Sequence, residues 1–312
     1  MPGPPFSNVR STGQRIRIGV CADDYGLTPG VGRGIRELLA AGRISATSVM
    51  AGSEYWPEEA PAIRPFAASA DIGLHITLTD QVPLGVLPIF APDGQFPPLA
   101  KVLRAGLSRH LPLAEIEAEI ERQLATFVKH FGAPPAHIDG HHHIHQLPGI
   151  REIVVRMAAR LRPAGTYVRC CAEPASVILK RGVTPGKALL ISILGKGLAR
   201  QLRLAGLPSN SGFSGAYGYG TETRPLPEIF GRFLRGAGPG HLVMCHPGYS
   251  DAVLADKDTL TAAREAELAF LGGETWPRLL AEAGLVIGPL RAAHGVRPRH
   301  LSASGGVGLT PN

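Results

Sequence analysis

Three short runs of the sequence concentrate side chains that bind metal ions or transfer protons. The densest run, residues 137–145, holds five of the chain's 12 histidines together with Asp139. A second run contains the adjacent carboxylates Asp23 and Asp24, and a third places His75 among apolar residues. Imidazole is the commonest metal-binding side chain near neutral pH, and a carboxylate can either ligate a metal or fix the tautomer of the ring. We therefore expect the three runs to meet at one divalent metal ion in a hydrolytic site.

The adjacent carboxylates can divide two roles between them. Their side chains diverge, so that one can bind a cation while the other faces a substrate. Like charges this close resist joint ionisation unless a metal or an arginine compensates. We assign Asp24 to the metal and Asp23 to general base catalysis. The ordinary alternative is a helix cap or a turn, where Asp is common, and the pair alone would favour that alternative.

The histidines need the same weighing. A lone histidine in an apolar run is more often a hydrogen-bonded structural residue than a ligand, but His75 lies near a strand end and other candidate ligands exist. One or two histidines of run 137–145 are expected to bind the metal, and the others to contact substrate or solvent. One Asp and two His leave coordination positions open for water and a carbonyl oxygen. Such a ligand set suits Zn, Mn, Co, Ni or Mg.

Composition limits the class of protein. With 312 residues, 44% hydrophobic and 18% charged, the chain can bury a core. Its net charge of +7 is scattered, without a Lys/Arg block, which favours a solvated basic surface over a nucleic-acid partner. Four cysteines without a CxxC pair indicate free thiols in a reducing, cytoplasmic compartment. The sequence shows no signal peptide and no apolar run of about 18 residues that could span a membrane.

Apolar patterns predict alternating strands and helices that would position these residues. Strands are predicted at 15–22, 46–51, 71–78, 137–139, 166–170, 241–246 and 285–287, and helices at 28–41, 58–68, 113–131, 149–161, 226–235, 260–271 and 276–283. The long segment 80–99 is expected to be a loop that covers the site, and 209–219 a flexible one. The apolar, basic segment 175–207 favours a core or crossover helix over a partner-binding arm.

This alternation is typical of an α/β protein with a parallel sheet, either closed as a barrel or open and doubly wound. The acid pair, His75, the histidine run and His246 all fall at predicted strand ends. These positions favour a barrel, because the strand ends converge only there. We expect a barrel domain over residues 15–290, a disordered leader at 1–14 and a flexible tail at 291–312.

Read together, these motifs resemble the YdjC/ChbG family of carbohydrate deacetylases. The matching stretches are ADDYG at 22–26, SATSVM at 45–50, GLHITL at 73–78, HIDGHHHIH at 137–145 and MCHPG at 244–248. The ordered combination is specific, although no single motif is, and it spans about residues 16 to 289. The chain also resembles the relative of this family that is associated with hopanoid biosynthesis.

The resemblance implies a distorted TIM-type barrel, a homodimer and one divalent metal ion, with Mg expected before Zn, Mn, Co or Ni. Matched position by position, the metal ligands fall on Asp24, His75 and His141, and the base on Asp23. We add His246 as general acid and Arg169 as the group that steers Asp23. Tyr25 stands where the family usually has Phe, and Gly140 where it often has Ser, so both are expected to alter the lining of the site.

The favoured function is a metal-dependent hydrolase that removes the acetyl group of an N-acetylated sugar or glycolipid. Asp23 would take a proton from the attacking water, and His246 would protonate the leaving amine. A metal-dependent phosphoesterase is one alternative, but it normally needs two metals, and the sequence offers ligands for one site. A non-catalytic sugar- or metal-binding barrel is the other alternative, and it would not need Asp23.

Overall fold

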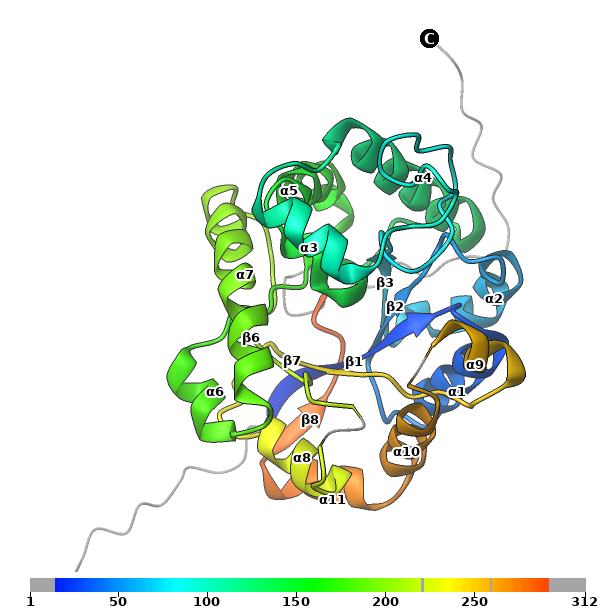
Figure 1. Cartoon of the computed structure of the whole chain (residues 1–312). Coiled ribbons are helices and arrows are strands. Elements are labelled where there is room, and N and C mark those ends of the chain that lie inside the picture. The colour runs from blue at the N-terminus through cyan, green and yellow to red at the C-terminus, as the bar shows by residue number, and fades with distance from the viewer. Residues whose placement is uncertain (1–14, 220–221, 259, 292–312) are drawn as a thin grey trace, which may run out of the picture.

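The structure, a computed structural model, describes residues 15–219, 222–258 and 260–291. These residues form a parallel sheet with helices packed around it (Figure 1). The strands are β1 (Ile16–Tyr25), β2 (Ala46–Val49), β3 (Asp71–Ile76), β4 (His137–Gly140), β5 (Tyr167–Val168), β6 (Gly212–Ser214), β7 (His241–Cys245) and β8 (Leu285–Ile287). All the pairings between these strands are parallel.

The sheet runs in the order β5-β4-β3-β2-β1-β7-β6, and β8 pairs with β1 outside this path. Its two ends meet, because a parallel bridge joins Val168 of β5 to Ser209, just before β6. The backbone N–H of Val168 donates to the carbonyl of Pro208 at this seam, at 3.0 Å. The described strands therefore form a distorted (β/α) barrel, which confirms the predicted fold class.

The distortion arises at β1, where β8 and β2 share one edge. The carbonyl of Ile18 accepts from Gly288 beside β8, and the carbonyl of Val20, two residues on, accepts from Ser45 beside β2. Carbonyls two residues apart point to the same side of a strand. Thus β8 supports the amino end of β1, and β2 pairs with its carboxyl end.

The helices are α1 (Pro29–Ala40), α2 (Trp56–Ile63), α3 (Leu99–Leu107), α4 (Leu113–Phe131), α5 (Ile150–Leu161), α6 (Ala175–Arg181), α7 (Pro185–Leu204), α8 (Leu226–Phe233), α9 (Ala252–Lys257), α10 (Thr261–Gly272) and α11 (Thr275–Glu282), with 3-10 turns η1 (Arg64–Ala68), η2 (His141–Gln146) and η3 (Arg162–Ala164). Local sequence explains their ends. The Thr28 hydroxyl accepts from the N–H of Val31 and Pro29 opens α1, while Gly132, with φ at 86°, ends α4.

Several predicted elements need correction. Helix 113–131 and strand 285–287 are confirmed with their bounds. Strand β1, however, continues through the acid pair to Tyr25. The predicted loop 209–219 contains β6 and is largely buried, segment 175–207 forms α6 and α7, and α3 and α9 were not predicted.

The predicted leader and nearly all of the predicted tail lie outside the described residues, so the domain bounds stay a prediction. The four cysteines are buried and free, as the sequence indicated. Among the described residues no helix combines the length and the apolar character of a membrane span.

Candidate active site and metal centre

The predicted site residues converge at the carboxyl ends of the barrel strands. Asp23 and Asp24 lie in β1 and His75 in β3, while His141, Arg169 and His246 follow β4, β5 and β7. All except Arg169 line one cavity of about 690 Å³. Arg169 is fully buried beside it. Parallel barrels place their active sites at this end.

A bulge in β1 explains how two consecutive carboxylates reach one cavity. Successive side chains of a regular strand point to opposite faces. Here the register between β1 and β2 shifts between Ala22 and Tyr25, and Asp24 has φ at 68°, in the left-handed region. A non-glycine residue seldom adopts this conformation, and such bulges re-aim side chains next to active sites.

Asp24, His75 and His141 offer ligand atoms that lie within 4.8 Å of one another. Asp24 Oδ1 is 3.1 Å from His141 Nδ1 and 3.3 Å from His75 Nε2. Asp24 and His75 are buried, and His141 is partly open to the cavity. Three protein ligands with one open side are typical of a catalytic metal site.

The surroundings of His75 test whether these residues fit a metal. Its Nδ1 lies 2.6 Å from Asp139 Oδ1, so Nε2 faces Asp24. Burial lowers the pKa of His75, but the carboxylates of Asp139 and Asp24 raise it to about 10. Without a metal the ring therefore carries a proton between two carboxylates. A divalent cation can take the place of that proton, with Asp139 fixing the tautomer, so the residues fit the ion.

Arg169 joins the candidate base to the candidate metal centre. Its guanidinium donates to both oxygens of Asp23, at 2.7 and 2.6 Å, and approaches Asp139 Oδ2 at 2.7 Å. All three side chains are buried. A bidentate pair of this kind fixes the plane of the carboxylate as well as its position.

Arg264 was missed from the sequence, although it contacts the predicted ligand Asp24. Its Nη2 lies 2.5 Å from Asp24 Oδ2 and 2.6 Å from Asp258 Oδ2. Burial would raise the pKa of Asp24, but Arg264 and His141 hold it well below its usual range. The sequence does contain a sign of its burial. Arg264 lies on the apolar face of α10 with Leu268 and Leu271, at positions i, i+4 and i+7.

His246 is held by two residues that the sequence did not indicate. Its Nδ1 is 2.5 Å from the Tyr219 hydroxyl, and its backbone N–H donates to Glu267 Oε2 at 2.5 Å. Burial lowers the pKa of His246 to about 4. The ring is therefore neutral at neutral pH, and it must gain a proton during the reaction before it can act as an acid.

Among the five histidines of the run, only His141 joins the ligand cluster. His142 hydrogen-bonds Thr79 at 3.0 Å, and His145 donates to the Arg169 carbonyl at 2.9 Å. The expectation that Tyr25 and Gly140 alter the lining is wrong, since neither lines the cavity. The Tyr25 hydroxyl points instead toward α2 and donates to a backbone carbonyl there.

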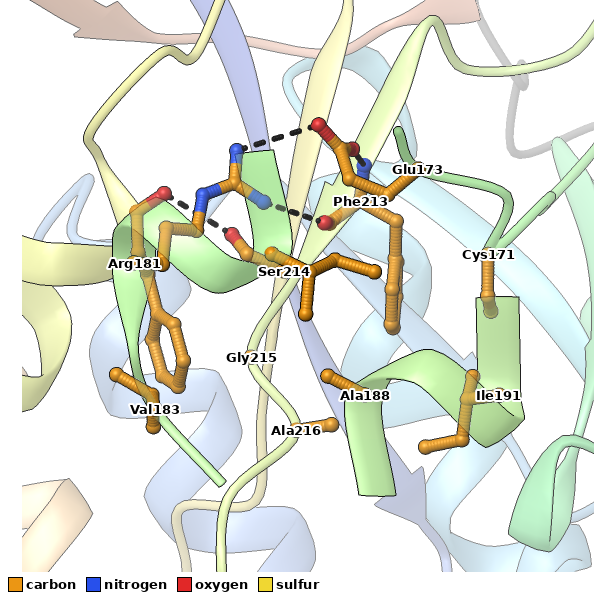
Figure 2. A pocket seen from close by; sticks show the side chains of 12 residues that line it. Cys171, Glu173, Arg181, Val183, Ala188, Ile191, Phe213, Ser214, Gly215 and Ala216 are labelled. Atoms are coloured by element: carbon orange, nitrogen blue, oxygen red, sulfur yellow. Dashed lines mark hydrogen bonds and ion pairs between the residues drawn. The ribbon is translucent and has the colours of Figure 1, made fainter. Parts of the chain in front are cut away.

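A second, much smaller cavity of about 30 Å³ adjoins the first and shares Ile191 and Ala216 with it. Figure 2 shows Arg181 closing this space, donating to the Phe213 carbonyl at 2.9 Å and facing Glu173. A volume of this size holds about one or two water molecules. The candidate active site is the larger of these two cavities, because the predicted site residues line it.

Comparisons with known proteins agree with this geometry. A family model described as YdjC-like protein matches residues 17–282. Chitooligosaccharide deacetylases from Serratia marcescens and from Enterobacter sp. (strain 638) are 31% and 30% identical, each over 86% of this chain and 96% of the relative. The crystal structure of a candidate cellobiose-phosphate cleavage protein from Enterococcus faecalis V583 shares the fold, with a TM-score of 0.67 and 20% identity over 90% of this chain and 99% of that one.

Proposed function

The chain belongs to the YdjC-like protein family, and from this premise we infer that it is a carbohydrate deacetylase, a hydrolase that releases acetate from an N-acetylated sugar. One observation carries the inference to this chain's own residues. Asp24, His75 and His141 cluster within 4.8 Å in the same cavity that Asp23 lines, held by Arg169. We propose these five residues, with His246, as the catalytic set.

Asp24, His75 and His141 would hold the divalent ion, for which we expect Mg, with Zn, Mn, Co or Ni as the other candidates. When bound, such an ion supplies a Lewis acid for the acetyl carbonyl and eases the deprotonation of water. The cavity of about 690 Å³ is large enough for a sugar unit with its acetyl group.

Asp23 acts in this proposal as the general base that accepts a proton from the attacking water. The bidentate contact with Arg169 holds its carboxylate in one orientation. His246 starts neutral and hydrogen-bonded to Tyr219. It takes up a proton from solvent as the tetrahedral species forms and then delivers that proton to the leaving amine. Asp23 returns the proton that it took from the attacking water to solvent after acetate leaves.

The wider setting follows from the same residues. Four buried, free cysteines favour the reducing cytoplasm as the compartment. We expect a homodimer, an N-acetylated sugar or a glycolipid as substrate, and no nucleic-acid partner. Light scattering on the purified protein would measure the assembly.

The decisive experiment combines metal analysis with acetate release from N-acetylated chitooligosaccharides. Asp24→Ala and His141→Ala should lose bound metal and lower turnover by about 1,000-fold or more. His142→Ala is the matched control, because this neighbouring histidine bonds Thr79 and should keep the metal. Chelation of the wild type should abolish turnover, and adding back the ion should restore it.

Three outcomes would contradict the proposal. Full deacetylation by metal-free Asp24→Ala or His141→Ala would remove the metal from the mechanism. Release of phosphate from sugar phosphates in preference to acetate would favour a phosphoesterase. Tight sugar binding without any acetate release would indicate a binding protein.

A further inference from the structure

Large exposed hydrophobic side chains are concentrated on segments that also line the cavity. Eleven such side chains occur among the described residues. Eight of them lie on three segments: Val82, Leu84, Val86 and Ile89 before α3, Leu107 in α3, and Leu190, Ile193 and Leu204 in α7. The same three segments supply cavity-lining residues. An apolar cluster that rims an active site marks an interaction surface better than scattered hydrophobics do.

The loop of residues 80–98 is built to present its apolar side chains outward. Leu87 and Phe90 are buried beneath it, whereas Val86 is 91% and Ile89 73% exposed. Its backbone is hydrogen-bonded to α4, since both oxygens of Glu115 accept from the N–H of Ile89. The exposed Val86 and Ile89 therefore belong to an ordered loop with its own small core.

The two helices of the rim are basic. Helix α7 carries Lys187, Lys196, Arg200 and Arg203, and α3 carries Lys101 and Arg104, while neither helix contains an Asp or a Glu. On α7 the exposed residues Leu190 and Ile193 alternate with these cations. Both helices pack against η2, the turn that carries the histidines, and both stand at the near side of the barrel in Figure 1.

We propose that this rim, formed by loop 80–98, α3 and α7, docks the protein onto an anionic lipid bilayer. Helices with Lys and Arg beside exposed Leu and Ile bind such interfaces through buried apolar area and attraction to acidic headgroups. Val86 and Ile89 would enter the headgroup region. The cavity would then open toward the membrane surface.

Charge argues against a second copy of the chain as the occupant. A symmetric dimer places the same patch on both subunits. Five of the six basic side chains of α3 and α7 lie outside the cavity lining, and they would face five more. The rim helices offer no carboxylate to pair with them, and the rim loop carries only two, Asp80 and Asp93. An anionic bilayer can pair its acidic headgroups with the basic side chains and bury the exposed apolar side chains at the same time. The inference concerns binding, so it does not depend on the reaction proposed above.

The test is cosedimentation of the full chain with vesicles of phosphatidylcholine alone or with about one third phosphatidylglycerol. The wild type should bind the anionic vesicles and release as salt increases. Lys196→Gln with Arg200→Gln should weaken binding by about fivefold per charge. Val86→Ser with Ile89→Ser should weaken it by about tenfold or more. None of these four residues lines the cavity.

Val128→Ser with Lys129→Gln is the matched control, because both residues are exposed at the end of α4 that leads into the amino end of β4. It should bind vesicles like the wild type. The proposal fails if the wild type stays in the supernatant, or if the control loses as much binding as the rim variants. It also fails if the wild type is a dimer that does not bind vesicles and the rim variants are monomers, because the rim would then be the dimer interface.

Acetate release from a soluble N-acetylated chitooligosaccharide, assayed in parallel, separates the two proposals. All variants should keep the wild-type rate there, which shows that the fold and the cavity are intact. A wild type that binds vesicles but releases no acetate would contradict the deacetylase and leave the docking surface standing.

Discussion

At the scale of single residues, the proposed metal ligands depend on side chains that do not line the cavity. Asp139 is fully buried between His75 and Arg169, and it accepts from the Ser48 hydroxyl at 2.6 Å. Burial would raise the pKa of Asp139, but Arg169 and His75 hold it well below its usual range. One ionised carboxylate therefore orients a ligand and also the arginine that holds Asp23.

Asp139→Asn tests this role. The new amide can satisfy either His75 or Arg169 as an acceptor, but its NH₂ group would face the donor on the other side. We expect metal affinity to fall by about 10- to 100-fold, as for other changes behind a metal ligand. Isothermal titration with the metal measures it. Ser48→Ala, which removes another contact of the same carboxylate, should change affinity far less.

Glu267 offers a prediction about pH. Burial raises its pKa from 4.5 to about 7. The folded state therefore holds this proton more tightly than the unfolded chain does. The contribution of Glu267 to stability is greatest below pH 4.5, falls between about pH 4.5 and 7, and stays constant above pH 7. Glu267→Gln can keep the contacts with Tyr217 and the N–H of His246. At pH 8 it should raise the free energy of unfolding by about 3 kcal/mol.

The check is urea denaturation at pH 5 and pH 8. The gap between Glu267→Gln and the wild type should shrink markedly at pH 5, where the wild-type carboxyl is largely protonated. Glu265→Gln on the same helix is exposed and should show little effect at either pH. Equal destabilisation by Glu267→Gln at both values would mean that hydrogen bonding, rather than the proton, dominates.

The residue scale also shows where the sequence was sufficient. Residue types in short motifs singled out Asp24, His75 and the histidine run, and the family resemblance then selected His141 as the third proposed ligand. The structure brings these three side chains together. Arg264 and Glu267 were not found, because their role depends on contacts with residues more than twenty positions away. When an ion pair joins distant segments, the sequence shows only a charged residue on an otherwise apolar helix face, which is a weak indication of its role.

At the scale of elements, helix α4 anchors the loop that forms one side of the cavity mouth. Glu119 is fully buried, and its oxygens accept from the N–H of Leu84 at 3.0 Å and of Gly85 at 3.2 Å. Arg122 and Gln123 donate to the same carboxylate. The loop keeps its shape through these bonds, because its own secondary structure is slight.

Glu119→Gln should therefore loosen the loop. The NH₂ group of the new amide would face N–H donors that the carboxylate now accepts from. A buried polar group left without a partner costs about 1 to 3 kcal/mol of stability. We expect the amide hydrogens of Leu84 and Gly85 to exchange with solvent at least about tenfold faster, which hydrogen exchange measures peptide by peptide. Glu117 lies on the same helix as Glu119, and Glu117→Gln breaks only an exposed pair with Arg156 of α5, so it should leave these rates unchanged.

The elements that the sequence predicted well are those with a regular apolar period. The helix at 113–131 was predicted with its bounds because its core positions recur at helical spacing and Gly132 ends it. Strand β1 was predicted to end before the paired acids, because adjacent carboxylates are typical of a loop. In the structure Arg169 and Arg264 neutralise their charges, so the strand can continue through them. Strand β6 was predicted as part of a loop, because its three residues carry almost no periodic signal. Strand β5 was predicted at 166–170, and the structure shortens it to two residues.

At the scale of the whole molecule, the barrel is closed by one weak seam between β5 and β6. Apart from the bridge at Ser209, the two strands are joined by the side chain of Asn210, which bonds backbone groups that would otherwise lack a partner strand. Its Oδ1 accepts from the Cys170 N–H at 2.7 Å, and its Nδ2 donates to the carbonyls of Cys170 and Gly212 at 2.8 and 2.9 Å. An amide can do this because it donates and accepts at once.

Asn210→Ala should open this seam. Three buried hydrogen bonds are lost and their partners are left unpaired, which costs about 2 to 4 kcal/mol in the free energy of unfolding. Urea denaturation measures this, with Ser211→Ala as the control, because that exposed hydroxyl only donates to the Pro239 carbonyl. A loss below about 0.5 kcal/mol in Asn210→Ala would mean that the ring does not depend on the seam.

The same variant should separate metal binding from turnover. The ligands come from β1, β3 and the turn after β4, none of which is a strand of the seam, whereas Arg169 follows β5 directly at it. Under conditions where Asn210→Ala stays folded, its metal content should match the wild type while kcat falls, because Arg169 no longer holds Asp23 in place. Loss of metal in step with activity would show instead that the barrel responds as one rigid body.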